Sequence, residues 1–215
     1  FEWFGNHGIV IQRSGDEREY AGTVSGVDGV KLVLLSAGEI PRELAAGRIH
    51  LGVTGSDMVR EKLGANDCRV DQLAELGFGH AELIIAVPTA WVDVDLLEDL
   101  DAAAAAFRKK HGFRLRIATK YHRLTREFLQ ENGVADYQLV DSQGATEGTV
   151  KNLTAEAISD ITSTGETLRA NHLKILTDGS IHKSQASLFR SDSAAWSDAD
   201  KAAYRVLMGK LRLSQ

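Results

Sequence analysis

The stretch "AISDITSTGETL", residues Ala157–Leu168, decides how this chain is interpreted. Its first half has the apolar and β-branched composition of a strand, and a helical pattern begins at its end. Hydroxyl residues and one glycine stand between the two. Such a junction has two interpretations. Either Ser163 or Thr164 caps the next helix, or the hydroxyl and backbone N–H groups hold a phosphate.

Short β-rich runs alternate with helical patterns on both sides of this junction. Upstream the order is "VKLVLLS", "GEIPRELAAG", "IHLGVTG", "SDMVREKL" and "AELIIAVP", and nearer the junction it is "LRIATK", "LTREFLQENG" and "DYQLVD". This rhythm indicates βαβ units and parallel strands. We therefore expect an α/β fold with two open lobes and a cleft between them.

The division into lobes is expected near Pro88, where an apolar strand ends before an alanine-rich helix. Lobe I would comprise residues 1–87 together with 176–215, and lobe II residues 88–175. The segment from Ser193 to Leu213 has the pattern of a helix that closes lobe I.

Composition limits the classes of function. With 215 residues, of which 43% are hydrophobic, the chain can form one large domain or two small lobes. A net charge of -5 argues against general nucleic-acid binding. Cys68 is the single cysteine, so no intrachain disulfide is expected and a cytoplasmic location fits. The apolar run Leu83–Pro88 is too short to span a membrane.

Asp160 lies near the end of the predicted strand, at the edge where open α/β sheets bind their ligands. In the phosphate interpretation, the loop that follows supplies hydroxyl and N–H donors, and its glycine lets the backbone approach closely. The loop residues are Ser163, Thr164, Gly165, Glu166 and Thr167. Glu156, four residues before Asp160, stands roughly 13 Å away along an extended strand. It is therefore expected to be a structural carboxylate.

Two further strand exits carry polar residues. "LGVTGSDMV" offers Thr54, Gly55 and Asp57, and its simpler interpretation is a tight turn capped by Ser56 or Asp57. Paired with the first junction, it suits a ligand with separated polar groups that lies between two lobes.

"IATKYHRLTR" offers Thr119, Lys120 and Tyr121, followed by Arg123 and Arg126. The cations could neutralise phosphates and Tyr121 could stack on a base, but a solvated helix face with a half-buried tyrosine explains them equally well. The seven histidines show no metal-binding spacing, so no protein-held metal is expected.

Five blocks resemble a known family in their order along the chain: "LGVTGSD", "LAELGFGHAELIIAVP", "LRIATKYHRLTREFLQENG", "DITSTGETL" and the strand ending "SLF". The family is that of the ATP phosphoribosyltransferases, which catalyse the first step of histidine biosynthesis, and the resemblance runs from about Val30 to Arg190. It implies a fold like that of type II periplasmic binding proteins. It also implies that Ser163–Thr167 hold the 5′-phosphate of 5-phosphoribosyl 1-diphosphate and that Asp160 is the catalytic carboxylate near the ribose hydroxyls. The ATP and cleft residues would be Thr54, Gly55, Asp57, Thr119, Lys120, Tyr121 and Glu147.

The chain departs from the family pattern at two places. "SAGE" at Ser36–Glu39 stands where many members have Arg-Pro-x-Asp, so that contact is not expected here. "GATE" at Gly144–Glu147 keeps the glycine and carboxylate of the commoner Gly-Ser-Val-Glu. The family usually begins with a strand and a basic loop, and we expect this chain to start after them.

The resemblance is to the short form of the family, which lacks a C-terminal regulatory domain. It implies a homodimer that associates with a separate subunit similar to histidyl-tRNA synthetase. The implied reaction transfers the phosphoribosyl group to N1 of ATP and releases pyrophosphate, with Mg²⁺ carried by the diphosphate substrate. The alternative is a two-lobed ligand-binding or sensor module without catalysis, which the fold alone permits.

Overall fold

The computed structural model describes residues 1–13, 21–142 and 144–213, and the chain forms two compact units. Unit 1 is built from residues 1–78 and 186–215, and unit 2 from residues 79–185. The sequence prediction placed these boundaries at 87/88 and 175/176. They fall elsewhere because β6 (Ala81–Pro88) and β10 (Leu173–Ser184) pair with each other along most of their length, inside the sheet of unit 2.

Unit 2 contains a five-stranded sheet in the order β10-β6-β9-β7-β8. Its other strands are β7 (Leu115–Thr119), β8 (Tyr137–Asp141) and β9 (Ala157–Thr162). β7 runs parallel to both β8 and β9, as the βαβ rhythm predicts. The prediction of parallel strands is wrong for β6 and β10, because β6 is antiparallel to β9 and β10 is antiparallel to β6.

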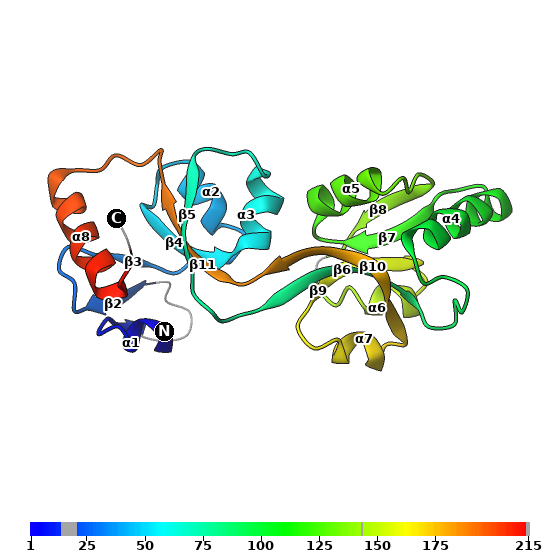
Figure 1. The fold of residues 1–215 in the computed structure, drawn as a ribbon, viewed down its shortest axis with the longest axis horizontal. Helices are drawn as coiled ribbons and strands as arrows, with labels where there is room; N and C mark the ends of the chain where they lie inside the picture. Colours follow the sequence, from blue (N-terminus) through cyan, green and yellow to red (C-terminus); the bar gives the residue numbers. More distant parts are fainter. Residues whose placement is uncertain (14–20, 143, 214–215) are drawn as a thin grey trace. The chain divides into compact units, whose positions relative to one another are not determined.

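Helices cover both faces of this sheet (Figure 1). On one face lie α4 (Leu97–His111) and α5 (His122–Glu131), and on the other lie the short α6 (Gly148–Lys151) and α7 (Glu166–Ala170). Successive residues of a strand point to opposite faces. Ile85 accordingly packs in the core beneath α4 and α5, while Ile84 packs in the core with Leu168 of α7.

Unit 1 contains two three-stranded sheets. The first is an antiparallel meander of β1 (Val10–Arg13), β2 (Ala21–Ser25) and β3 (Leu32–Val33). β3 lies in the predicted β-rich run "VKLVLLS", whereas β1 and β2 were not predicted. The second has the order β4-β11-β5, with β4 at Leu51–Gly55, β5 at Val70–Glu75 and β11 at Ala186–Ser191. β11 is antiparallel to both neighbours, so the parallel pairing expected for "IHLGVTG" is wrong, and the late segment of the chain completes a sheet begun by the early one.

Four helices complete unit 1: α1 (Glu2–Gly5), α2 (Ile40–Ala45), α3 (Ser56–Leu63) and α8 (Asp198–Leu211). The predicted closing helix is confirmed as α8. It begins with a capping box, in which the Asp200 N–H donates to the Ser197 hydroxyl and the Ser197 N–H donates to the Asp200 carboxylate. Met208 and Leu211 of α8 are buried in the core of unit 1 with Leu188 of β11.

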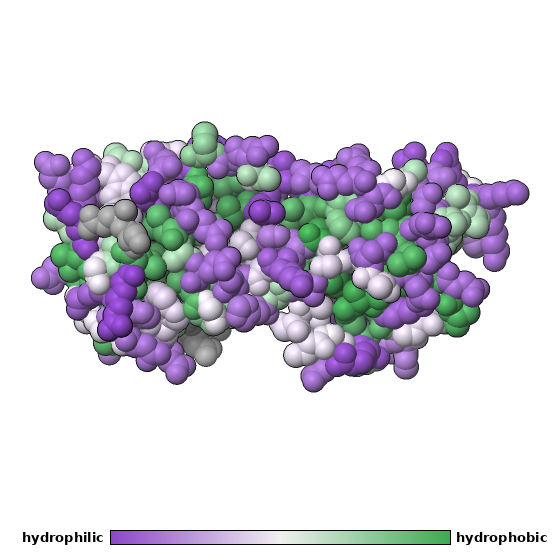
Figure 2. Space-filling view, in the orientation of Figure 1, coloured by the Kyte–Doolittle hydropathy of each residue, from purple (hydrophilic) through white to green (hydrophobic). Residues whose placement is uncertain are grey.

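The surface shown in Figure 2 is mainly hydrophilic in both units, with apolar residues emerging between polar ones. Within the described part of the chain, none of the helices has the length and apolar character needed to cross a bilayer. The described residues also contain no group of three or more His, Cys, Asp or Glu side chains that could hold a metal ion.

Candidate active site

Three strand-exit loops lie at one edge of the sheet in unit 2. The parallel strands β7 and β8 end in register, with Thr119 beside Asp141, and Thr119 also pairs with Ser159 of β9, which continues to Thr162. The loop after β7 carries Lys120 and Tyr121, the loop after β8 carries Gly144–Glu147, and the loop after β9 carries Ser163–Thr167. The carboxyl edge of parallel strands is where open α/β sheets bind ligands. Three of the predicted groups of residues therefore share one edge of unit 2.

Asp160 is a partly desolvated carboxylate on β9. The two-residue period of the strand puts it on the same face as Ile158 and Thr162, which is the face covered by α6 and α7. Its side chain is 13% exposed, and Oδ1 accepts a hydrogen bond from the Ile161 N–H at 2.8 Å. Nζ of Lys120 lies 3.6 Å from the same oxygen. The structure thus brings together two predicted site residues, one from β9 and one from the loop after β7.

The loop after β9 is a compact left-handed turn. Gly165 has φ +71° and is itself the N-cap of α7, so neither Ser163 nor Thr164 occupies the cap position. The Gly165 N–H donates to the Thr162 hydroxyl at 2.9 Å, and the Glu166 N–H donates to the Thr164 hydroxyl at 3.4 Å. These hydrogen bonds join the backbone of the turn to its own hydroxyl groups. The sequence analysis did not name Thr162 among the loop residues.

The outer side of this loop is open to solvent. Ser163, Thr164 and Thr167 are exposed, whereas Gly165 is buried. The Ser163 hydroxyl donates to the backbone carbonyl of His80 at 3.0 Å, which ties the loop to the segment before β6. The loop is therefore preformed, and a bound anion would exchange some of these internal hydrogen bonds for bonds to itself.

The loop after β7 differs from its predicted role. Thr119 is fully buried, and its hydroxyl accepts from the Tyr121 N–H at 2.9 Å. Tyr121 is 1% exposed, so in this conformation its ring packs inside unit 2. It is therefore neither placed to stack on a base nor half-buried, which were the two roles that the sequence allowed. Lys120 remains partly exposed, with Nζ 5.6 Å from the centre of the Tyr121 ring. Burial here is a property of the tertiary packing, which the local sequence does not encode.

The loop after β8 is anchored by a buried hydroxyl pair. Thr146 is fully buried, and the Ser142 hydroxyl donates to its oxygen at 3.1 Å. Gly144 has φ +125°, and Glu147 is half-buried at the N-cap of α6. The predicted carboxylate therefore stands on the same sheet edge as Asp160.

Two further contacts fix the strands beneath the site. The hydroxyls of Thr125 on α5 and Ser159 on β9 are both fully buried and lie 2.8 Å apart. Glu156 accepts from the Arg116 N–H at 2.8 Å and from its guanidinium at 2.5 Å, as expected for a structural carboxylate. This ion pair raises the pKa of Arg116 through the hydrogen bond to Glu156.

The Thr-Gly turn of unit 1 is more deeply buried. Thr54 is 5% exposed, and its hydroxyl donates to the Ala37 carbonyl at 3.0 Å. Gly55 is the N-cap of α3, and Asp57 in the first turn of that helix is 6% exposed. The contact of Thr54 holds the Ser36–Glu39 loop against β4, which is a role in folding.

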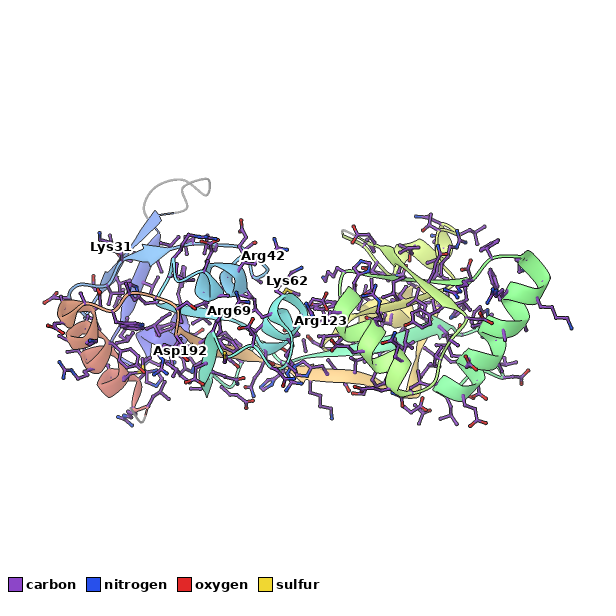
Figure 3. The ribbon with its side chains drawn as sticks, turned by 90° about the horizontal axis from the view of Figure 1, so that it is seen from above. Lys31, Arg42, Lys62, Arg69, Arg123 and Asp192 are labelled. Carbon is purple, nitrogen blue, oxygen red and sulfur yellow. The ribbon has the colours of Figure 1, made fainter. Side chains whose placement is uncertain are left out.

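The Ser36–Glu39 loop has a carboxylate and a nearby cation. The Ser36 N–H and hydroxyl donate to the Glu39 carboxylate at 2.9 and 2.6 Å, and the hydroxyl bond is the main reason that the pKa of Glu39 lies below its usual value. Lys62 of α3 reaches this loop, since its Cε lies 3.7 Å from the place a Cβ on Gly38 would occupy. Figure 3 labels Lys62 together with Arg42 of α2, which packs against α3. The sequence analysis did not name Lys62 among its candidate residues.

By its fold, this chain belongs to the class of α/β proteins built from two units. A solved substrate-binding protein of an amino acid ABC transporter matches 94% of this chain and 86% of its own with a TM-score of 0.53 at 13% identity. A solved ATP phosphoribosyl transferase (HisG:HisZ) complex from Thermotoga maritima matches 98% of this chain and 88% of its own with a TM-score of 0.72 at 18% identity. At these identities both likenesses establish the fold alone, and they confirm the binding-protein-like α/β architecture.

Sequence comparison then identifies the family. The family model of ATP phosphoribosyltransferase, HisG, matches residues 36–212. An ATP phosphoribosyltransferase of Cereibacter sphaeroides is 74% identical over 93% of this chain, and one of Mesorhizobium japonicum is 50% identical over 95%. A third, from Bradyrhizobium sp. (strain ORS 278), is 48% identical over 96%. The chain belongs to the ATP phosphoribosyltransferase family, whose members are transferases. It spans 84% and 88% of the length of the first two relatives and 63% of the third.

Proposed function

We propose that this chain transfers the 5-phosphoribosyl group of 5-phosphoribosyl 1-diphosphate to N1 of ATP, releasing pyrophosphate, as the first step of histidine biosynthesis. The observation that supports this most is the pairing of Asp160 with Lys120 at 3.6 Å, directly before the hydroxyl–glycine loop, in a chain of this family. A binding or sensor module without catalysis is not favoured, because a relative 74% identical is an ATP phosphoribosyltransferase.

In the proposed complex, the loop Ser163–Thr167 binds the 5′-phosphate of the donor. Gly165 in its left-handed conformation shapes the turn that presents the loop hydroxyls to the phosphate. Asp160 then lies at the start of the loop, where its carboxylate accepts hydrogen bonds from the ribose hydroxyls. Glu147 and Lys120 border the same sheet edge and are proposed as contacts of the polar substrates.

The chemical step is a displacement at the anomeric carbon. N1 of the adenine forms the new bond to that carbon, and the diphosphate leaves with the electron pair of the C–O bond, so the configuration inverts. This reaction asks for little covalent participation of the protein, because positioning and stabilisation of developing charge supply most of the rate. We propose that Mg²⁺ accompanies the diphosphate, since hard cations that retain waters often bind substrate phosphates.

Thr54, Gly55 and Asp57 of unit 1 remain proposed contacts of ATP. Thr54 is the weakest of the three candidates, because its hydroxyl is committed to the Ala37 carbonyl. Thr119 and Tyr121 of unit 2 support the ATP site through packing in the present conformation, since both are buried.

We further propose that the chain forms a homodimer in the cytoplasm and associates with a histidyl-tRNA-synthetase-like subunit. The support for a second subunit is the fold shared with the HisG:HisZ complex of Thermotoga maritima. We expect weak turnover from the isolated chain, and activity and histidine sensitivity on addition of that subunit, because a partner that prefers one conformation shifts its population. Initial rates with and without the subunit, at several histidine concentrations, test this. Full activity and full histidine inhibition of the isolated chain would contradict it.

The reaction itself is tested by measuring pyrophosphate release. The rate should require ATP, the diphosphate donor and Mg²⁺ together, and it should be lost on omission of any one. The matched control is Glu156→Gln, which changes a carboxylate that lies directly before β9 and is paired with Arg116. Absence of pyrophosphate with both substrates, with and without the second subunit, together with tight binding of a small solute, would favour the sensor module instead.

A further inference from the structure

We propose that the guanidinium of Arg169 provides the positive charge for the phosphate bound at the Ser163–Thr167 loop. The inference rests on the proposed function and adds a binding residue to its site. It is carried by the position of the Arg169 side chain, whose Nη1 lies 3.1 Å from the place a Cβ on Gly165 would occupy.

Helix geometry explains why this side chain covers the loop. The Arg169 N–H donates to the Gly165 carbonyl at 3.0 Å, so Arg169 stands one helical turn after the glycine. Side chains of a helix lean toward its N-terminus, and a residue covers the surface of the turn that precedes it. The guanidinium therefore lies over Gly165, which is buried, while Arg169 itself is exposed to solvent.

The charges around the loop explain why an arginine is needed there. Residues 160–170 contain two acidic side chains, Asp160 and Glu166, and one basic side chain, Arg169. Lys120 lies 3.6 Å from Asp160, so its charge is shared with that carboxylate. A phosphate monoester carries up to two negative charges near neutral pH. Without Arg169, the dianion would meet a loop whose own side chains are neutral or acidic.

The guanidinium is available for a ligand. Among the described residues, no carboxylate forms an ion pair with Arg169. An arginine can donate two parallel hydrogen bonds to a phosphate, and such charge-assisted bonds are about twice as strong as neutral ones. The loop N–H groups of Gly165 and Glu166 are already bonded to the Thr162 and Thr164 hydroxyls, which leaves more of the binding to the side chain that covers them.

The position also gives Gly165 a second reason to be glycine. Its φ of +71° favours glycine for the backbone, and a Cβ there would stand 3.1 Å from the guanidinium. A larger residue at 165 would therefore both strain the turn and push Arg169 away from the loop.

The test compares Arg169→Gln and Arg169→Lys with the wild type. The matched control is Arg114→Gln, an exposed arginine directly before β7, at the opposite edge of the same sheet. Ribose 5-phosphate and ribose are titrated calorimetrically into each protein, and KM is measured for the diphosphate donor and for ATP. A thermal melt of each variant checks that the fold is retained.

We expect Arg169→Gln to weaken ribose 5-phosphate binding roughly 10- to 100-fold and to raise KM for the donor to a similar extent. The KM for ATP should stay within about twofold, and Arg169→Lys should recover part of the loss because it restores charge but not the planar fork. Arg114→Gln should behave like the wild type.

Unchanged ribose 5-phosphate binding by Arg169→Gln would overturn the inference, as would an equal rise of both KM values. If the wild type binds ribose 5-phosphate but releases no pyrophosphate with or without the second subunit, the proposed reaction fails while the titration still decides the role of Arg169. A wild type that binds no ribose 5-phosphate would overturn the loop assignment and Arg169 together.

Discussion

The two Thr-Gly turns of this protein resemble each other in sequence and differ in structure. In unit 1, "LGVTGSD" passes directly from β4 into the eight-residue helix α3, and Gly55 has an ordinary φ of −71°. In unit 2, "DITSTGETL" makes a left-handed turn at Gly165, with φ +71°, before the five-residue α7. Thr54 is buried, whereas Thr164 is exposed.

The difference shows what a hydroxyl–glycine turn contributes in each place. The Thr54 hydroxyl donates to a backbone carbonyl and stabilises the fold of unit 1. The loop of unit 2 turns its exposed hydroxyls outward while Thr162 closes it from within. The same residue types therefore support folding where they are covered, and where they are open we propose that they bind the phosphate.

The largest effect is expected for Asp160→Asn. The amide lacks the negative charge that pairs with Lys120. It also accepts weaker hydrogen bonds from the ribose hydroxyls than the carboxylate does. We expect kcat/KM to fall by about 10²- to 10³-fold with little change in the thermal melt. Steady-state kinetics of pyrophosphate release measure this, and unchanged kinetics in a folded variant would make Asp160 a structural residue.

A somewhat smaller effect is expected for Thr164→Ala or Thr167→Ala. Each removes one hydroxyl from the exposed side of the loop, and loss of a hydrogen bond to a charged group costs about 1.5–3 kcal/mol. The affinity for the diphosphate donor should fall, and the affinity for ATP should not. A binding titration in which both substrates lose equal affinity would remove the distinction between the two turns.

The sequence predicts the site's location better than its details. The order of strands and turns is enough to place Lys120, Glu147 and Asp160 at strand exits, because parallel strands end at one edge. The burial of Thr54, Thr119 and Tyr121 is not predictable from their neighbours, since it depends on contacts with distant segments. Arg169 could have been found, because its spacing of four residues from Gly165 puts both on one side of the helix.

The fold shows the same division between local and non-local information. The helices α4 and α8 follow from their own sequences. The antiparallel pairings of β6 with β10 and of β11 with β4 join segments far apart in the chain, and local periodicity carries no signal for them. β5 was missed because its residues, "VDQLAE", are partly charged and none of them is fully buried.

Thr54→Val should affect stability and leave donor binding intact. The variant removes the hydroxyl that donates to the carbonyl of the exposed Ala37, and loss of one such hydrogen bond costs about 0.5–1.5 kcal/mol of unfolding free energy. Chemical denaturation gives this free energy, and donor KM gives the comparison with Thr164→Ala. A raised donor KM without destabilisation would place Thr54 in the phosphate site and erase the contrast.

The smallest effect is expected at Asp67, in a turn of unit 1 before β5. Its hydrogen bond with the Arg69 side chain lowers its pKa from 3.8 to about 2. Because the folded-state pKa is depressed, the stabilisation is fully present above the unfolded-state value near 3.8 and is lost as the pH falls toward 2. Asp67→Asn should therefore melt slightly lower than the wild type at neutral pH, and the difference should vanish near pH 2. A constant difference over that range would contradict the ion-pair origin.

The central claim, that the turn of unit 2 and not that of unit 1 binds the ribosyl phosphate, is tested most directly by NMR. Ribose 5-phosphate is titrated into the ¹⁵N-labelled chain, and the backbone amide shifts of both turns are followed. The account predicts saturable shifts at Gly165, Glu166 and Thr167, with the amides of Thr54 and Gly55 unmoved. Shifts confined to Thr54 and Gly55, with residues 163–167 unmoved, would contradict it.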